Sequence, residues 1–174
     1  MKGLIHIYTG DGKGKTTAAV GMALRAAGNG MRVVFVQFLK GTPSGEVSLL
    51  SIINGITVLR NTEDFEFFRQ MTGEQKQKVT RMHNENLSEA LRLVEEGHCD
   101  MLVLDEVLAA CLNGTVDAGK IEGLLDRKPE ALELVLTGRD APPSFIERAD
   151  YVSEIKKIKH PYDRGIGARK GIER

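Results

Sequence analysis

The residues with the clearest chemical potential lie near the N-terminus, in the stretch TGDGKGKTT at residues 9–17. A phosphate-binding loop follows the pattern G-x-x-x-x-G-K-[ST], whose backbone amides, lysine and hydroxyl bind phosphates and Mg²⁺. The GKT run at residues 14–16 fits this pattern, but the first glycine is displaced. Thr9 stands where the pattern has glycine, and Gly10 follows one residue later. The stretch still predicts a site for a triphosphate, because glycines remain at alternate positions along it.

Phosphate binding at this loop would use its backbone and two side chains. Glycines let successive amides point at an anion, and the N-terminus of a following helix adds its dipole. Lys15 can reach the bridging and terminal phosphates, and the Thr16 hydroxyl can ligate Mg²⁺. A glycine-rich turn without a ligand is the alternative, but GKTT directly after an apolar run favours the nucleotide site. The candidate binding residues are Thr9, Gly10, Asp11, Gly12, Lys13, Gly14, Lys15, Thr16 and Thr17.

A second candidate element is MLVLDE, in which four apolar residues precede Asp105 and Glu106. In phosphate-loop proteins an acid at the end of a neighbouring strand holds Mg²⁺ directly or through water. Asp105 could instead cap a helix that begins at Glu106. With the loop present, the metal-binding interpretation is favoured for both acids.

Two further elements have less specific patterns. Arg139 follows an apolar run and could clamp phosphate with two N–H groups, or it could be a surface residue in the turn before Pro142. The run FEFF at residues 65–68 is either a hydrophobic anchor for a long loop or an apolar surface for a large flat ligand. The four histidines lack the spacing of metal ligands, and no serine or cysteine has a local nucleophile signature.

The elements that must position these residues alternate between short apolar runs and longer amphipathic ones. One helix is expected from the loop to about residues 28–30, and another from Thr72, which forms a T-x-x-Q capping box with Gln75, to Gly97. Residues 40–46 are expected to form a loop. The expected apolar face of the second helix is Val79, Met82, Leu87, Ala90, Leu91 and Val94. The strand candidates are residues 3–8, 32–38, 56–60, 100–106, 131–139 and 150–155. Strands that are apolar on both faces predict an α/β fold, a three-layer α/β/α sandwich with a mostly parallel sheet.

The whole chain has the composition of one soluble globular domain. It has 174 residues, 41% of them hydrophobic and 28% charged, with a formal net charge of zero. No nucleic-acid or membrane partner is therefore expected. Two cysteines without C-x-x-C spacing fit a reducing compartment, and the first apolar run is too short for a signal peptide, so a cytoplasmic location is expected.

The C-terminal tail at residues 156–174 differs from the rest of this single domain. It carries seven lysines and arginines against two acidic residues, with three glycines and little apolar periodicity. Two interpretations remain open at this point: a solvated, partly mobile terminus, or a basic flap that meets an anion.

Taken together, several motifs resemble those of one family, the phosphate-loop ATP:corrinoid (cob(I)alamin) adenosyltransferases. They are the extended loop region TGDGKGKTTAAVGMALRAAGNGMRVVFVQFLKG, then LVLDEV, LTGRDAP and the ending KHPYDRGIGARKGIE. The resemblance spans nearly the whole chain, and this family's loop has its glycine at the position of Gly10. It implies a RecA-like phosphate-loop fold. It also implies attack of a Co(I) corrinoid on the 5′ carbon of ATP, with release of intact triphosphate.

The resemblance also implies a role for each matching residue. Lys15 and the amides of residues 10–14 would hold the triphosphate, with Thr17 and Arg139 as further phosphate contacts. Thr16 and Glu106, with Asp105 nearby, would hold Mg²⁺. Phe65 and Phe67 would lie against the lower face of the corrin, where Phe67 replaces a tryptophan familiar in the family. The cobalt would be the nucleophile, reduced by an electron donor such as a flavoprotein, and a homodimer is expected.

Some family members carry an N-terminal extension that covers the active site, whereas only Met1 and Lys2 precede Gly3 here. The expectation is either a more open corrinoid site or cover from the basic tail. Two other functions stay in competition: a phosphate-loop ATPase or small-molecule kinase in which Glu106 activates water or a hydroxyl, and a nucleotide-binding sensor with little turnover.

Overall fold

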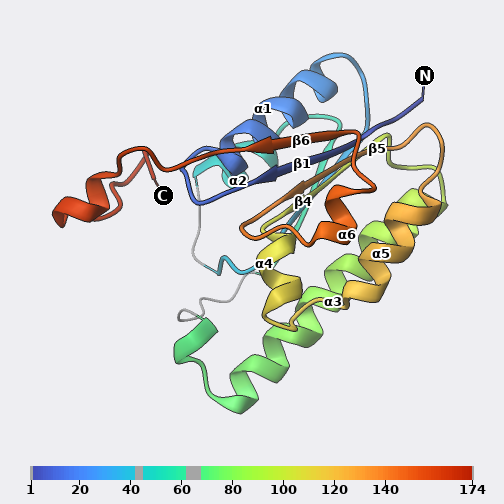
Figure 1. Ribbon diagram of the computed structural model, residues 1–174. Helices are drawn as coiled ribbons and strands as arrows, with labels where there is room; N and C mark the ends of the chain where they lie inside the picture. Colours follow the sequence, from blue (N-terminus) through green and yellow to red (C-terminus); the bar gives the residue numbers. More distant parts are fainter. Residues whose placement is uncertain (1, 42–44, 62–67, 174) are drawn as a thin grey trace.

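The computed structural model describes residues 2–41, 45–61 and 68–173, and it shows an α/β fold around one sheet (Figure 1). All strand pairs in the described residues are parallel, and the strand order is β3-β2-β4-β5-β1-β6. The strands are β1 (Ile5–Thr9), β2 (Val33–Gln37), β3 (Ile56–Arg60), β4 (Met101–Asp105), β5 (Glu133–Thr137) and β6 (Tyr151–Glu154). The α/β prediction with strands near these positions is confirmed.

Helices cover both faces of the sheet and make the expected three layers (Figure 1). The helices are α1 (Lys15–Gly28), α2 (Gly45–Leu50), α3 (Gly73–Glu95), α4 (Val107–Leu112), α5 (Ala118–Arg127) and α6 (Pro143–Ile146), with 3₁₀ turns η1 (Phe68–Gln70) and η2 (Pro161–Arg164). On one face, α1 and α2 pack on alternate strand residues such as Phe35 and Val103. On the other, α3 to α6 pack on the residues between them, such as Val36 and Leu104. Because both faces are covered, β2 and β4 are buried at every position.

Helix α3 begins as predicted, but its buried face differs from the predicted one. Thr72 and Gln75 form both hydrogen bonds of the capping box. The buried residues of α3 are Val79, His83, Leu87, Ala90 and Val94. His83 therefore lies in the stripe where Met82 was expected, and Met82 and Leu91 are only partly buried. The prediction counted only apolar residues, so it could not place the polar residue His83 at a core position.

The strand order brings the candidate chemistry to one end of the sheet. Strand β5 lies between β1 and β4, so the ends of the loop strand and the acidic strand are one strand apart. The carboxyl ends of parallel strands meet at the same edge, where ligands bind in open α/β sheets. At this edge Asp105 ends β4, and the phosphate loop, the β2–α2 connection and Arg139 follow strands β1, β2 and β5.

The structure differs from the predicted elements at three short helices, one of which lies partly in a predicted loop. Helix α2 begins at Gly45, inside the segment expected to be a loop, and α5 and α6 were not predicted. Phe65 and Phe67 lie outside the described residues. Within the described ranges, no helix is both long enough and apolar enough to cross a membrane.

Candidate active site

The displaced glycine of the loop is explained by the path of the chain after β6. Gly12 N–H donates to the Ile155 carbonyl at 2.7 Å, and Ile155 N–H donates to the Thr9 carbonyl at 2.8 Å. A Cβ atom at Gly10 or Gly12 would lie 2.5 or 2.7 Å from the Ile155 oxygen. Gly10 also has a φ of 102°, which favours glycine. Glycine is thus required where β6 crosses the loop, one residue after Thr9, which is still a strand residue.

Lys15 lies folded over its own loop at the start of α1. Its ammonium donates to the carbonyls of Gly10 at 2.8 Å and Gly12 at 2.9 Å. Removal from water lowers the pKa of Lys15, while the negative charges of Glu106, Asp11 and Asp105 oppose this shift. The side chain is therefore held in place by the loop, and it lines the same cavity as the rest of residues 11–17.

The carboxylate of Asp105 is fully buried at the end of β4 and has donors on both oxygens. Its Oδ1 accepts from the hydroxyls of Thr16 at 2.9 Å and Thr137 at 2.7 Å. Its Oδ2 accepts from Gln37 Nε2 at 3.3 Å and lies 3.8 Å from the Lys40 ammonium. A buried carboxylate needs such partners, because removing an ionised carboxylate from water without them costs on the order of several kcal/mol of folding free energy. These contacts connect the ends of β2, β4 and β5 with the start of α1, which follows β1.

The next residue, Glu106, places its carboxylate differently. Its backbone is left-handed, with a φ of 61°, and its N–H donates to the Thr137 hydroxyl at 2.9 Å. Burial raises the pKa of the Glu106 carboxyl, and so does the charge of Asp105, against the opposing charges of Lys40, Lys15 and Arg139. A cation beside Glu106 would offset this cost of ionisation.

These groups fit the ligand chemistry of Mg²⁺. The Thr16 hydroxyl donates its proton to Asp105, which leaves its oxygen lone pairs for a metal. Glu106 offers a carboxylate in the cavity lining. The described residues contain no cluster of three or more His, Cys, Asp or Glu side chains that could hold a metal. Mg²⁺ at nucleotide sites takes one or two protein oxygens and completes its shell with phosphates and water, so two protein ligands suffice.

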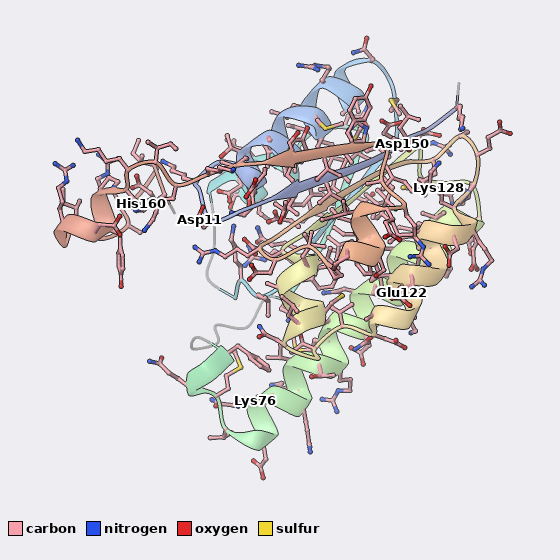
Figure 2. The ribbon with its side chains drawn as sticks, viewed as in Figure 1. Asp11, Lys76, Glu122, Lys128, Asp150 and His160 are labelled. Atoms are coloured by element: carbon pink, nitrogen blue, oxygen red, sulfur yellow. The ribbon has the colours of Figure 1, made fainter. Side chains whose placement is uncertain are left out.

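The loop, Glu106 and the tail line one cavity of about 740 Å³, which is the size of a cofactor or nucleotide site. Its lining includes residues 11–17, Lys40, Glu46, Glu106 and Arg139. The tail completes it with residues 160–162, 166–169 and 171–173. Figure 2 shows Asp11, in the loop, and His160, in the tail, at the same end of the sheet.

Specific bonds hold the tail against the loop. Lys157 N–H donates to the Asp11 carboxylate at 2.9 Å, which is the main reason that the pKa of Asp11 is lowered. The Lys13 ammonium lies 3.3 Å from Glu173. These contacts and the shared cavity favour the second interpretation of the tail, a basic flap beside an anion site.

The structure brings together most of the predicted site residues and adds others. The loop, Asp105, Glu106 and Arg139 lie around or beside one cavity, whereas Phe65 and Phe67 lie outside the described residues. The Gly12 amide, predicted as a phosphate donor, bonds to Ile155 instead. Around Asp105, sequence reasoning assigned no role to Gln37, Lys40 and Thr137. Gln37 and Thr137 end β2 and β5, Lys40 follows β2, and the VQFLKG motif contains Gln37 and Lys40.

Replacing Gly12 with alanine should separate the tail from the loop. The added Cβ would lie 2.7 Å from a backbone oxygen, so Gly12→Ala should destabilise the protein by roughly 1–3 kcal/mol and weaken nucleotide binding. Gly21→Ala is the matched control, because Gly21 is an exposed glycine of α1 with no atom near its Cβ position. It should stabilise by about 0.5–1 kcal/mol. Urea unfolding measures both, and a Gly12→Ala protein as stable as the parent would contradict the crossing geometry.

Glu106→Gln should change stability in a pH-dependent way. Because folding raises the Glu106 pKa, stability is lost as the pH rises from the carboxyl's ordinary pKa through its raised value in the folded protein. Glu106→Gln removes that loss, so it should raise the free energy of unfolding of the ligand-free protein at about pH 8 and have less effect near pH 5. Urea unfolding at both pH values tests this, with exposed Glu122→Gln on α5 as the control. An equal effect at both pH values would show that Glu106 carries no burial penalty.

Comparisons with known proteins show the family of this chain. The profile of the family described as ATP:corrinoid adenosyltransferase BtuR/CobO/CobP matches residues 1–174. The corrinoid adenosyltransferase of Escherichia coli K12 is 35% identical over 99% of this chain and 86% of its own length. The corresponding protein of Sinorhizobium sp is 37% identical over 99% of this chain and 80% of its own. That of Salmonella typhimurium LT2 is 34% identical, with 99% and 86% covered. This chain belongs to the ATP:corrinoid adenosyltransferase BtuR/CobO/CobP family.

Proposed function

We propose that this protein transfers the 5′-deoxyadenosyl group of ATP to the Co(I) centre of a corrinoid and releases triphosphate, for adenosylcobalamin biosynthesis or salvage. Family membership over the whole chain supports the proposal. The observation that carries it is the single cavity that joins a phosphate loop, a cation-rich lining and the acid Glu106. Cobalt supplies the electron pair that forms the Co–C bond. The C5′–O bond breaks, and its electron pair leaves with the triphosphate.

In this proposal the protein stabilises the leaving group and positions both substrates. Lys15 and the amides of residues 13–17 bind the phosphates, and Arg139 approaches them from the end of β5. Their positive charges act most strongly as negative charge builds on the departing triphosphate. The tail is held against the loop by its contacts with Asp11 and Lys13, and it covers the cavity. This cover excludes water, so that the Co(I) nucleophile meets ATP without competing hydrolysis.

We assign Mg²⁺ to Thr16 and Glu106, with Asp105 orienting Thr16 from behind. When bound, the ion neutralises charge on the phosphates. Asp105 already accepts hydrogen bonds from Thr16, Thr137 and Gln37, so we assign it the role of orienting the Thr16 ligand, with its carboxylate near the ion.

The corrinoid and the remaining partners complete the proposal. We assign Phe65 and Phe67, from the family resemblance alone, a role in displacing the lower axial ligand of the corrinoid, which makes Co(II) easier to reduce. An electron donor such as a flavoprotein supplies the electron. The protein acts as a homodimer in the cytoplasm.

A phosphate-loop ATPase or small-molecule kinase is the second candidate, and one observation favours it. Burial raises the pKa of Glu106, and a higher pKa makes a carboxylate a stronger general base. Such an enzyme would split ATP between its second and third phosphorus atoms, so the products distinguish the two functions.

The decisive experiment is incubation of the protein with ATP, Mg²⁺ and chemically reduced corrinoid, followed by separation of the phosphorus-containing products. We expect intact triphosphate and an adenosylated corrinoid in equal amounts. Lys15→Ala should lower the rate by at least a hundredfold and leave the fold intact, because its ammonium lies in the cavity lining. Lys120→Ala on α5, outside that lining, is the matched control. ADP and phosphate as products would refute the transferase function, and full activity of Lys15→Ala would refute the role of Lys15.

Phe65→Ala should slow cobalt reduction on the enzyme more than it weakens ATP binding. If Phe65 displaces the lower axial ligand, its loss should slow reduction of Co(II) to Co(I) on the enzyme about tenfold or more while ATP affinity stays within about twofold. Absorption spectroscopy follows the cobalt, and calorimetry measures ATP binding. An equal loss in both would assign Phe65 to packing instead.

A further inference from the structure

Histidine 83 is a buried polar residue that none of the proposed chemistry uses. It is 1% exposed on α3, and its ring packs nearly perpendicular to that of Phe38, with ring centroids 5.3 Å apart. Its Nε2 lies 3.2 Å from the Leu39 backbone N–H, and its Nδ1 lies 3.1 Å from the Thr115 hydroxyl. Burial lowers the His83 pKa to about 4.

The partners of His83 fix its tautomer. A backbone N–H can only donate, so Nε2 is the acceptor and the ring proton is on Nδ1. Nδ1–H then donates to the Thr115 hydroxyl, which in turn donates to the Ala110 carbonyl at 3.1 Å. Every group in this chain of hydrogen bonds has a partner, so the neutral ring is held in one orientation.

Leu39, the residue that His83 binds, has an unusual backbone. Its φ is 58°, in the left-handed region that residues other than glycine rarely adopt. Phe38 N–H donates to the Asp105 carbonyl at 3.0 Å and continues the sheet pattern, but Leu39 N–H turns away to α3. The chain therefore leaves the sheet at Leu39, and the next residue is Lys40.

Lys40 extends from this turn into the cavity. Its ammonium lies 3.8 Å from Asp105 Oδ2 and 3.9 Å from Glu46 Oε1. Both distances exceed a hydrogen bond, so neither carboxylate holds the ammonium closely. Lys40 shares the cavity lining with Lys15, Thr16 and Arg139, and its charge opposes the rise in the Glu106 pKa.

From this geometry we propose that Lys40 is a further phosphate-binding cation of the site, beside Lys15 and Arg139, and that His83 is the positioning residue that orients it by holding the Leu39 turn. Lys40 approaches the phosphates from the β2 side, opposite the loop that carries Lys15. This inference rests on the proposed function for the identity of the anion, a triphosphate chain. His83 acts only through the backbone, since α3 contributes no residue to the cavity lining.

The test compares four variants by calorimetric titration with Mg·ATP and with inorganic triphosphate. Lys40→Met should weaken both ligands about tenfold, because it removes one charge-assisted contact. His83→Asn keeps a donor for Thr115 but has no atom near Leu39, so it should weaken both ligands about threefold or more. His83→Gln can present its amide oxygen at the Nε2 position and should recover most of that loss. Asn84→Ala is the matched control: Asn84 also bonds to Thr115 from α3 but does not contact Leu39, so it should bind as the parent does.

The double variant Lys40→Met/His83→Asn separates positioning from general stability. If His83 acts through Lys40, adding His83→Asn to Lys40→Met should cause no further loss of affinity. Two losses that multiply, or a Lys40→Met protein that binds triphosphate as tightly as the parent, would overturn the proposal. Failure of the proposed function is distinguishable, because the parent would then yield no triphosphate from ATP and corrinoid while Lys40→Met still weakened Mg·ATP binding.

Discussion

A buried carboxylate determines how this site is built. Asp105 is inaccessible to water, and an ionised carboxylate in that position is tolerated only when hydrogen-bonded and charge-compensated. Its partners Thr16, Thr137 and Gln37 come from three other parts of the chain. The two carboxylate oxygens of Asp105 therefore hold the start of α1, the end of β5 and the end of β2 in place. A site that binds a flexible triphosphate benefits from this, because Thr16, Thr137 and Gln37 are already held in place by hydrogen bonds before the ligand arrives.

A second constraint is the close approach of two backbones. The residues after β6 cross the phosphate loop so tightly that a methyl group at residue 10 or 12 has no room. The glycine spacing of the loop is thus set partly by the protein's own sheet and only partly by phosphate. The same crossing leads the chain into the tail, which turns back to line the cavity. Edge strand, loop and tail form one connected structure.

Much of this could be predicted from the sequence, for physical reasons that differ between elements. The GKT run, the apolar strands and the Thr72 capping box are local signals, because the residues that make them contact one another within a few positions. Lys40 and Thr137 became site residues only through pairing across the sheet, which local patterns do not encode. His83 was passed over because a histidine among apolar residues has no distinctive spacing. Its role depends on Leu39 and Thr115, which are 44 and 32 residues away in the chain.

The position of β1 has a consequence for how the chain folds as it is synthesised. Strand β1 pairs with β5 on one side and β6 on the other, and both follow it by more than a hundred residues in the chain. β1 therefore has no neighbouring strand until residues 133–137 have left the ribosome. Until then the glycine-rich segment behind it lacks the sheet that shapes it, and the apolar side chains of β1 lack their partners. The nucleotide site thus forms only after β5 and β6 are made, although its loop is synthesised long before them.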